Sequence, residues 1–249
     1  DSPSGSQASD YSFTAPTIAP VAGSITPKAL TAVATIGGAT SKVYDGSTAA
    51  LGASVSGMVS GAIAGDTLSL DTSGLTLAYD SAHVASATQI AASGSTGLRI
   101  GSSASGSQAS DYSFTAPTIA AVAGSITPKA LTAVATIGGA NSKVYDGSTA
   151  ASGANVTGTV GGAIAGDTLS LDTSGLTLGY NSAHVASATQ IAASGSAGFG
   201  IGSSASGSQA SDYSFTAPTI APVAGSITPK ALTATAAIGG ATSKVYDGS

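Results

Sequence analysis

Hydrophobic and polar residues alternate with period two along several stretches of the chain, which is the pattern of a β-strand with one buried face. In residues 53–60, Val55 and Val59 lie on one face of such a strand. The opposite face carries Ser54, Ser56, Met58 and Ser60. We therefore expect residues 53–60 to form a strand whose serine-rich face contacts solvent.

A longer alternating stretch covers residues 66–80 and is interrupted at Thr72-Ser73-Gly74. Before the interruption the inward positions are Leu68 and Leu70. After it they are Leu75, Leu77 and Tyr79. The pattern fits two strands or one bent strand.

Further strands are expected at residues 28–36, 83–92 and 110–116, with Tyr112 and Phe114 facing inward in the last. Turn residues separate these stretches, and no 3.6-residue apolar period continues along the chain. The fold class is therefore all-β, and tandem immunoglobulin-like antiparallel β-sandwich modules fit best. A parallel β-helix is the competing fold, but it needs a repeat of about 20 residues that the sequence does not show.

The chain of 249 residues repeats itself with a period of 101. Residues 1–101 and 102–202 differ at 14 positions, and the remaining 47 residues begin a third copy. A unit of this length is a small domain rather than one turn of a solenoid, so each repeat is expected to bury its own core.

The differences between the repeats agree with the predicted strand faces. Six substituted positions fall on the faces expected to contact solvent: Ser54, Ser56, Met58, Ser60, Ala78 and Asp80. The inward positions Val55, Val59, Leu75, Leu77 and Tyr79 reappear unchanged one period later. Substitution at buried positions leaves cavities or strain, so this distribution supports the expected register.

Composition narrows the classes of protein to which the chain can belong. The net charge is −5, from 7 basic and 12 acidic residues, and there is no basic stripe for binding nucleic acid. The chain has no Cys, so neither disulfides nor thiolate chemistry is expected. No apolar window is long enough to span a membrane, and any export signal is expected to lie outside the segment.

Four phrases carry a resemblance to a known family: ITPKALTA at 25–32, SKVYDGST at 41–48, AGDTLSL at 64–70 and SDYSFTAPTIA at 110–120. In this order they resemble the YDG-type tandem repeat domain of bacterial filamentous-haemagglutinin-like adhesins, which are exported by two-partner secretion. The resemblance implies a Gram-negative adhesin or matrix protein whose repeats form a stalk. Residues 79–89 depart from the family pattern, as does Asp111-Tyr112.

The family frame places complete modules at 26–126 and 127–227, which we call the first and the second repeat. Residues 1–25 are then the C-terminal part of a preceding repeat, and 228–249 are the N-terminal part of a following one. If these end segments are ordered, we expect adjoining modules or a neighbouring chain to hold them.

No catalytic, cofactor-binding or metal-binding residue is predicted. His83 and His184 are equivalent, and the acid near His83, Asp80, becomes Asn181 in the next copy. We therefore expect both histidines to be solvated loop residues rather than metal ligands or acid–base groups. Nucleophile and phosphate-binding motifs are also missing, so an enzyme is not expected.

Asp45-Gly46 predicts a tight turn, with Tyr44 packed inward or binding the chain through its hydroxyl group. An ion at the module junctions, held through Asp66 or Asp71, is the alternative role for acidic residues. A Lys–Asn isopeptide bond is not expected because residues 26–126 contain no Asn. A Lys–Asp bond stays open, and an intact-mass measurement would reveal it.

The leading functional hypothesis is a structural stalk or fibre of a secreted bacterial surface adhesin or biofilm matrix protein, with modules that can associate laterally through edge strands. The expected partners are neighbouring repeats, other copies in a fibre and an unknown receptor or glycan, without nucleic acid or a membrane span. The alternative is a module that binds glycans or host proteins through its end loops. The aromatic residues weaken that alternative because they fall mostly on inward positions or beside turns: Tyr11, Phe13, Tyr44 and Tyr79.

Overall fold

The computed structural model describes residues 5–94, 98–101, 107–195, 199–202 and 207–249. Apart from three short 3₁₀ turns, the regular structure in these residues is β-strand. Contacts divide the chain into two compact units. The first comprises Asp1–Ala34, Ser56–Gly74 and Ser95–Thr118, and the second Thr35–Val55, Leu75–Gly94 and Ile119–Ser249. The second unit therefore contains the whole second repeat together with part of the first.

The strands follow the sequence repeat. Those of the first repeat are β1 (Lys28–Gly38), β2 (Ser41–Val43), β3 (Ala53–Ser60), β4 (Leu70–Asp71), β5 (Thr76–Tyr79), β6 (Gln89–Ser93), β7 (Arg99–Ile100), β8 (Tyr112–Phe114), β9 (Val122–Ala123) and β10 (Ser125–Thr127). Those of the second are β11 (Lys129–Gly139), β12 (Ser142–Val144), β13 (Ala154–Gly161), β14 (Leu171–Asp172), β15 (Thr177–Tyr180), β16 (Gln190–Ser194), β17 (Gly200–Ile201), β18 (Tyr213–Phe215), β19 (Val223–Ala224) and β20 (Ser226–Thr228). The 3₁₀ turns are η1 (Ala8–Asp10), η3 (Ala109–Asp111) and η5 (Ala210–Asp212).

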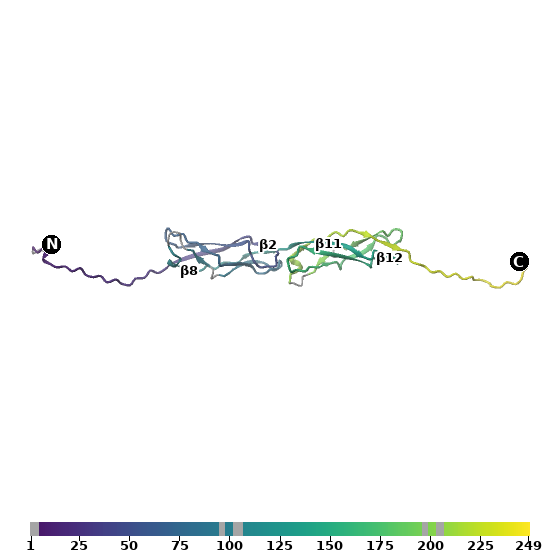
Figure 1. Ribbon diagram of the computed structural model, residues 1–249, viewed down its shortest axis with the longest axis horizontal. Coiled ribbons are helices and arrows are strands. Elements are labelled where there is room, and N and C mark those ends of the chain that lie inside the picture. Colours follow the sequence, from purple (N-terminus) through teal and green to yellow (C-terminus); the bar gives the residue numbers. More distant parts are fainter. Residues whose placement is uncertain (1–4, 95–97, 102–106, 196–198, 203–206) are drawn as a thin grey trace. The chain divides into compact units, whose positions relative to one another are not determined.

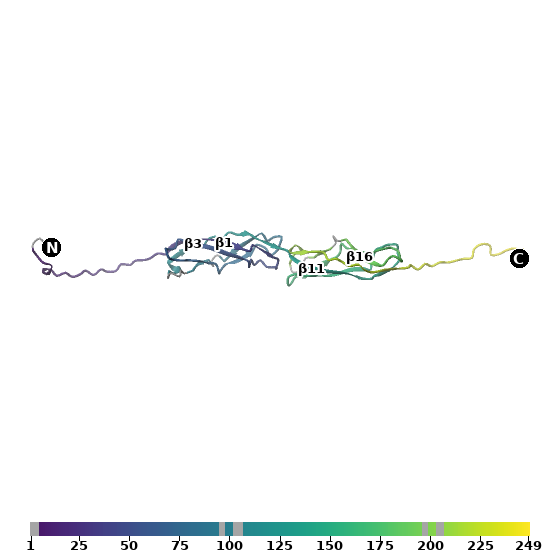
Figure 2. The ribbon, with the colours of Figure 1, turned by 90° about the horizontal axis from the view of Figure 1, so that it is seen from above.

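The second repeat is a two-layered β-sandwich. One layer has the strand order β13-β11-β18 and the other has the order β15-β16-β19; β14-β17 and β12-β20 form two further two-stranded sheets. The first repeat has the same orders, with β1 beside β3 (Figure 2). The prediction of all-β sandwich modules is therefore confirmed.

The strands that begin the second repeat pair in parallel with strands near its end. Lys129 to Leu131 of β11 pair with Tyr213 to Phe215 of β18, and after a break at Gly139 (φ +80°) β12 pairs in parallel with β20. Strands β11 and β12 are labelled in Figure 1. Since both strands of a parallel pair run the same way, the chain enters this repeat at one end of the ladders and leaves it at the other.

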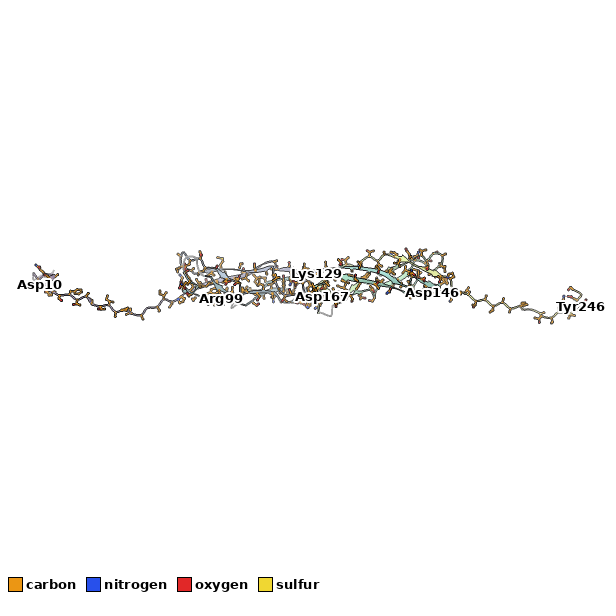
Figure 3. All side chains as sticks on the ribbon, in the orientation of Figure 1. Asp10, Arg99, Lys129, Asp146, Asp167 and Tyr246 are labelled. Atoms are coloured by element: carbon orange, nitrogen blue, oxygen red, sulfur yellow. The ribbon has the colours of Figure 1, made fainter. Side chains whose placement is uncertain are left out.

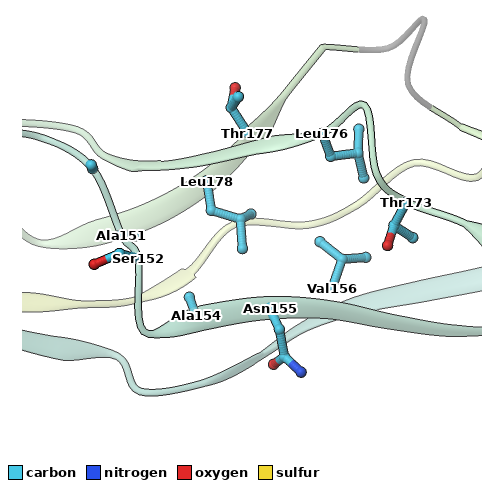
Figure 4. Close-up of a pocket in the computed structure, with 10 residues that line it drawn as sticks. Ala151, Ser152, Ala154, Asn155, Val156, Thr173, Leu176, Thr177 and Leu178 are labelled. Atoms are coloured by element: carbon cyan, nitrogen blue, oxygen red, sulfur yellow. The ribbon is translucent and has the colours of Figure 1, made fainter.

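The core of the second repeat lies between the two layers. The buried residues Ile137, Tyr180, Ile191 and Ile227 come from four strands of both layers. Several inward positions carry alanine, and an open pocket of about 440 Å³ lies between β13 and β15. Figure 4 shows Val156 and Leu178 pointing into this pocket, whereas the Asn155 side chain points away from it. The core is thin, in keeping with the low content of large apolar residues.

In the first unit, β8 pairs in parallel with the start of β1, and β4 pairs with β7. The Tyr112 hydroxyl group donates a hydrogen bond to Asp66 and accepts one from the Ile63 backbone N–H at 3.3 Å. Tyr112 therefore binds the loop that precedes β4 to β8.

Several predicted strands are confirmed, and one is largely wrong. Residues 53–60 form β3, and 28–36 lie within β1. In the range 83–92, however, only β6 is a strand, because the His83 carbonyl accepts hydrogen bonds from Ser86 and Ala87 in a turn. Asp80 stabilises this turn by accepting from the Thr88 backbone N–H at 2.8 Å, and Asn181 does the same for Thr189 at 2.9 Å.

The predicted faces are confirmed with one exception. The outward positions of β3 and Asp80 are exposed, and the inward positions are buried or half-buried. Ala78 is half-buried because an isolated bridge pairs it with Ala49.

The end segments carry no strand within the described residues: none before Lys28 and none after Thr228. Tyr11 and Phe13 are both exposed. Tyr11 directly follows the turn η1, so the prediction that the aromatic residues lie inward or beside turns is wrong only for Phe13. Tyr246 of the C-terminal segment is also exposed (Figure 3). None of the described helices has the length or apolarity of a membrane-spanning segment.

Candidate functional site at the junction of the two repeats

The two repeats follow each other without a flexible linker. The ladder of β10 with β2 ends at Thr127, and the ladder of β11 with β18 begins at Lys129, so only Pro128 separates them. Proline fixes its own φ and restricts the residue before it. The residues discussed below that meet at this junction all belong to the second compact unit.

Asp212 of the second repeat accepts two hydrogen bonds from the first repeat. The donors are His83 Nδ1 at 2.8 Å and the Val84 backbone N–H at 2.9 Å. The turn η5 positions Asp212, since its carboxylate also accepts from the Gln209 backbone N–H at 2.9 Å as part of a capping box. The Asp212 side chain is 0% exposed, so water does not reach the carboxylate that accepts these three bonds.

The surroundings of Asp212 favour its ionised form. Burial alone raises the pKa of a carboxyl group, but the hydrogen bonds from Gln209, His83 and Val84 outweigh burial and lower the pKa of Asp212. The equivalent Asp111 in the first repeat forms the same capping box with Gln108 but is exposed. The burial of Asp212 is therefore a property of the junction rather than of the turn.

Two tyrosines pack across the junction. The rings of Tyr44 and Tyr213 lie edge to face, with their centroids 5.3 Å apart and their planes at 77°. The Tyr213 hydroxyl group donates a hydrogen bond to Asp167, which is labelled in Figure 3. Burial is the larger cause and this hydrogen bond the second cause that raise the pKa of Tyr213 to about 12. Tyr44 is 4% exposed, whereas its equivalent Tyr145 is 37% exposed.

Gly46 of the predicted Tyr-Asp-Gly turn also lies at the junction. Its φ is +79°, and Ser47 donates its backbone N–H to Asp45, so the predicted turn is confirmed. A Cβ on Gly46 would lie 2.5 Å from Ile164 Cδ1, whereas one on Gly147 would meet no atom within 4 Å. The positive φ is what favours glycine here, because the overlap with the terminal methyl group of Ile164 is relieved when that side chain turns.

Lys42 holds the same turn from within the first repeat. Its Nζ donates to Asp45 Oδ1 at 2.7 Å, to the Ser47 carbonyl at 2.7 Å and to the Ala49 carbonyl at 3.1 Å. It also lies 5.4 Å from the centre of the Tyr79 ring. The second repeat has the same arrangement, and there the hydrogen bond from Lys143 lowers the pKa of Asp146 to about 2.

The prediction that both histidines are solvated is wrong for His83. Its side chain is 33% exposed and bonded to an acid 129 residues away, whereas His184 is exposed as expected. The acid that binds His83 lies in the next repeat, beyond the range of any local sequence pattern. The sequence does not single out Asp212, because the capping box of Gln209 and Asp212 departs from the usual Ser/Thr-x-x-Glu/Gln pattern.

Asp66 and Asp71, the two acids proposed as ion ligands, bind different partners. Asp66 accepts from Tyr112, and Asp71 accepts from the Ser73 backbone N–H at 3.0 Å. Over the described ranges, no group of three or more His, Cys, Asp or Glu residues could hold a metal ion. An open pocket of about 410 Å³ lies at the junction beside Tyr44, His83, Ile164 and Asp167. The side chains of the junction supply hydrogen bonds and packing between the repeats.

Comparison with known families agrees with this twofold organisation. The YDG domain matches residues 26–120 and again residues 127–221. The chain belongs to the YDG domain family. The two matches start at the residues where the two repeats were expected to start, and together they cover most of the chain. No curated protein and no solved structure gives a significant match.

Proposed function

We propose that the tandem YDG domains form a load-bearing stalk or fibre of a secreted bacterial surface adhesin or biofilm matrix protein. The observation that carries the proposal is the parallel pairing of the two strands that begin the second repeat with strands near its end, β11 with β18 and β12 with β20. Tension applied through the two ends of the repeat pulls β11 and β18 in opposite directions along their length. Their hydrogen bonds are then sheared together rather than opened one at a time.

The junction extends this role from one repeat to the next. Pro128 alone separates two ladders, and the bonds from His83 and Val84 to Asp212 oppose bending at that point. Because the residues of the junction occur in both repeats, the same contact can form wherever a further repeat follows. A series of such repeats adds length without adding flexible linkers.

Export by two-partner secretion, a position on the cell surface and lateral assembly of modules into filaments belong to this proposal. They follow from the resemblance of the four sequence phrases rather than from the geometry. The alternative of a glycan-binding module receives less support. Tyr44 and Tyr79 are buried, and so are Tyr112 and Tyr213, which are equivalent to the exposed Tyr11; buried rings are not available to a sugar.

Single-molecule force spectroscopy tests the proposal. The full chain has no Cys, so introduced cysteines give unique attachment points. One variant is pulled through its two ends. A second is pulled through Ala130→Cys and Ser214→Cys, which are paired, exposed residues of β11 and β18.

Pulling through the ends is expected to give two unfolding steps of about 35 nm each, from roughly 3.5 Å per residue over a repeat. The unfolding force should be several times higher than for the paired cysteines, since that geometry separates the strands bond by bond. Equal forces in the two geometries would contradict the load-bearing role.

A further inference from the structure

We propose that the edge strand β13 binds the β13 of a second copy of the chain in antiparallel register, and that β3 does the same in the first repeat. The inference rests on the proposed function, because it names the contact for the lateral association included there. The load-bearing role of a single chain does not depend on it.

Strand β13 is an open edge. It stands last in the order β13-β11-β18, and eight consecutive residues pair with β11 without a bulge. In an edge strand, alternate backbone N–H and C=O groups point away from the sheet and have no strand partner. Within the described parts of the chain, no other strand pairs with β13.

In the other layer, the outer side of the edge strand is covered. The outer side of β15 is covered by residues 149–151: the Tyr180 N–H donates to the Thr149 carbonyl at 2.7 Å, and the Ala151 N–H donates to the Leu178 carbonyl at 3.0 Å. The same sandwich therefore covers the outer side of one edge strand with its own chain, whereas the outer side of the longer strand β13 has no strand partner among the described residues.

The open edge also lacks the residues that normally prevent edge-to-edge pairing. Residues 147–166, which include β13, contain no charged residue and no proline. The same is true of residues 46–65 around β3. Lysine, proline and bulges are the usual protection of edge strands. The net charge of −5 is thus carried elsewhere, and two copies do not repel each other at this strand.

The alternation of side chains restricts the register of the pairing. Residues directly opposite in an antiparallel pair point to the same face, so outward residues must meet outward residues. Placing Thr157 opposite Thr157 of the second copy satisfies this condition. It brings Asn155 opposite Thr159, and Val156 opposite Gly158. No bulky or charged pair results.

A single pair of eight-residue strands buries far less than the roughly 800 Å² per partner of a stable complex, so each contact is weak. Tandem repeats supply the same strand many times along one chain, which increases the overall affinity by multivalency. A second copy is therefore the partner that this strand fits best.

Sedimentation velocity of the full chain over a concentration series tests the inference. The edge variant carries Ser56→Lys and Thr157→Lys, two exposed equivalent positions that would face their own copies. The control carries Gln89→Lys and Gln190→Lys, which add the same charge on exposed positions of β6 and β16, strands flanked on both sides. Circular dichroism shows that each variant is folded, and a Ser56→Asp, Thr157→Asp variant provides a second edge change.

The wild-type chain and the control should associate as concentration rises to about 1 mM, where a contact of about −4 kcal/mol is half occupied. Each edge variant alone should associate at least tenfold more weakly. An equimolar mixture of the Lys and Asp edge variants should associate again, because opposite charges then face each other. A wild-type chain that stays monomeric to that concentration, equal weakening in the control, or no recovery in the mixture would overturn the inference. None of these outcomes changes the unfolding force of a single chain.

Discussion

Replacing Asp212 by Ala, with Asp111→Ala as the matched control, measures the contribution of the junction to stability. Both variants lose the capping bond from the preceding glutamine N–H, which is 2.9 Å long at Asp212 and 2.8 Å long at Asp111. Only Asp212→Ala also loses the bonds from His83 and Val84. The difference between the two variants therefore isolates the contact between repeats.

The magnitude follows from these two bonds. A hydrogen bond to a charged group contributes about 1.5–3 kcal/mol, so two bonds at a fully buried carboxylate predict an extra loss of about 3 kcal/mol in the free energy of unfolding. Urea unfolding of the full chain, followed by circular dichroism and tyrosine fluorescence, gives this value. With a slope of about 1–2 kcal/mol/M, the midpoint shifts by roughly 2 M relative to the control.

A double-mutant cycle with His83→Ala adds a second check. The coupling energy between His83 and Asp212 should be about 1.5 kcal/mol, because one of the two bonds is shared. The same cycle with His184 and Asp212 should give no coupling. Equal losses for Asp212→Ala and Asp111→Ala would refute the reasoning.

Three further predictions concern groups at or near the turn, the junction and the core. Asp146 should titrate with a pKa of about 2 in carboxyl NMR, and Lys143→Ala should raise this pKa towards the ordinary value of an aspartate. A pKa that is the same in the variant would exclude the lysine as the cause. The pKa of Tyr213 is raised to about 12. Its contribution to stability is therefore present below the unfolded-state pKa and is lost as the pH rises through 12. In an absorbance titration Tyr213 should ionise last of the tyrosines, and Asp167→Asn should make it ionise at lower pH. Gly124→Ala should lower stability by about 1–3 kcal/mol. The reason is that its Cβ would lie 2.8 Å from Ile90 Cγ1 in the core, and an unchanged urea midpoint would show that this core yields to the methyl group.

Much of the fold could be predicted because the alternation of side chains depends only on neighbouring residues. β3 occupies the predicted residues 53–60, and its serine face is exposed. The prediction of a strand over residues 83–92 was wrong because the hydrogen bonds of one side chain stabilise a turn there. Asp80 accepts hydrogen bonds from Thr88 through both carboxylate oxygens and fixes a turn where the apolar pattern alone indicated a strand.

The junction could not be predicted from the sequence, because its partners are separated by a whole repeat. His83 and Asp212 are 129 residues apart, and each also occurs in a second copy that is exposed. The differences between the repeats do not indicate this contact either, because the histidine and the aspartate are the same in both copies. Only the fold shows that one repeat presents His83 where the next presents Asp212.

Amide hydrogen exchange at Val84 and Val185 in the unmodified chain tests the central claim, that the two repeats are joined by a specific contact. The two amides lie in the identical sequence SAHVASATQI, so their intrinsic exchange rates are the same. The Val84 N–H donates to the buried Asp212, and Val185 is on the exposed side of the second repeat with no such acceptor among the described residues. We predict slow exchange at Val84 and fast exchange at Val185. Equal rates at the two amides would contradict the claim.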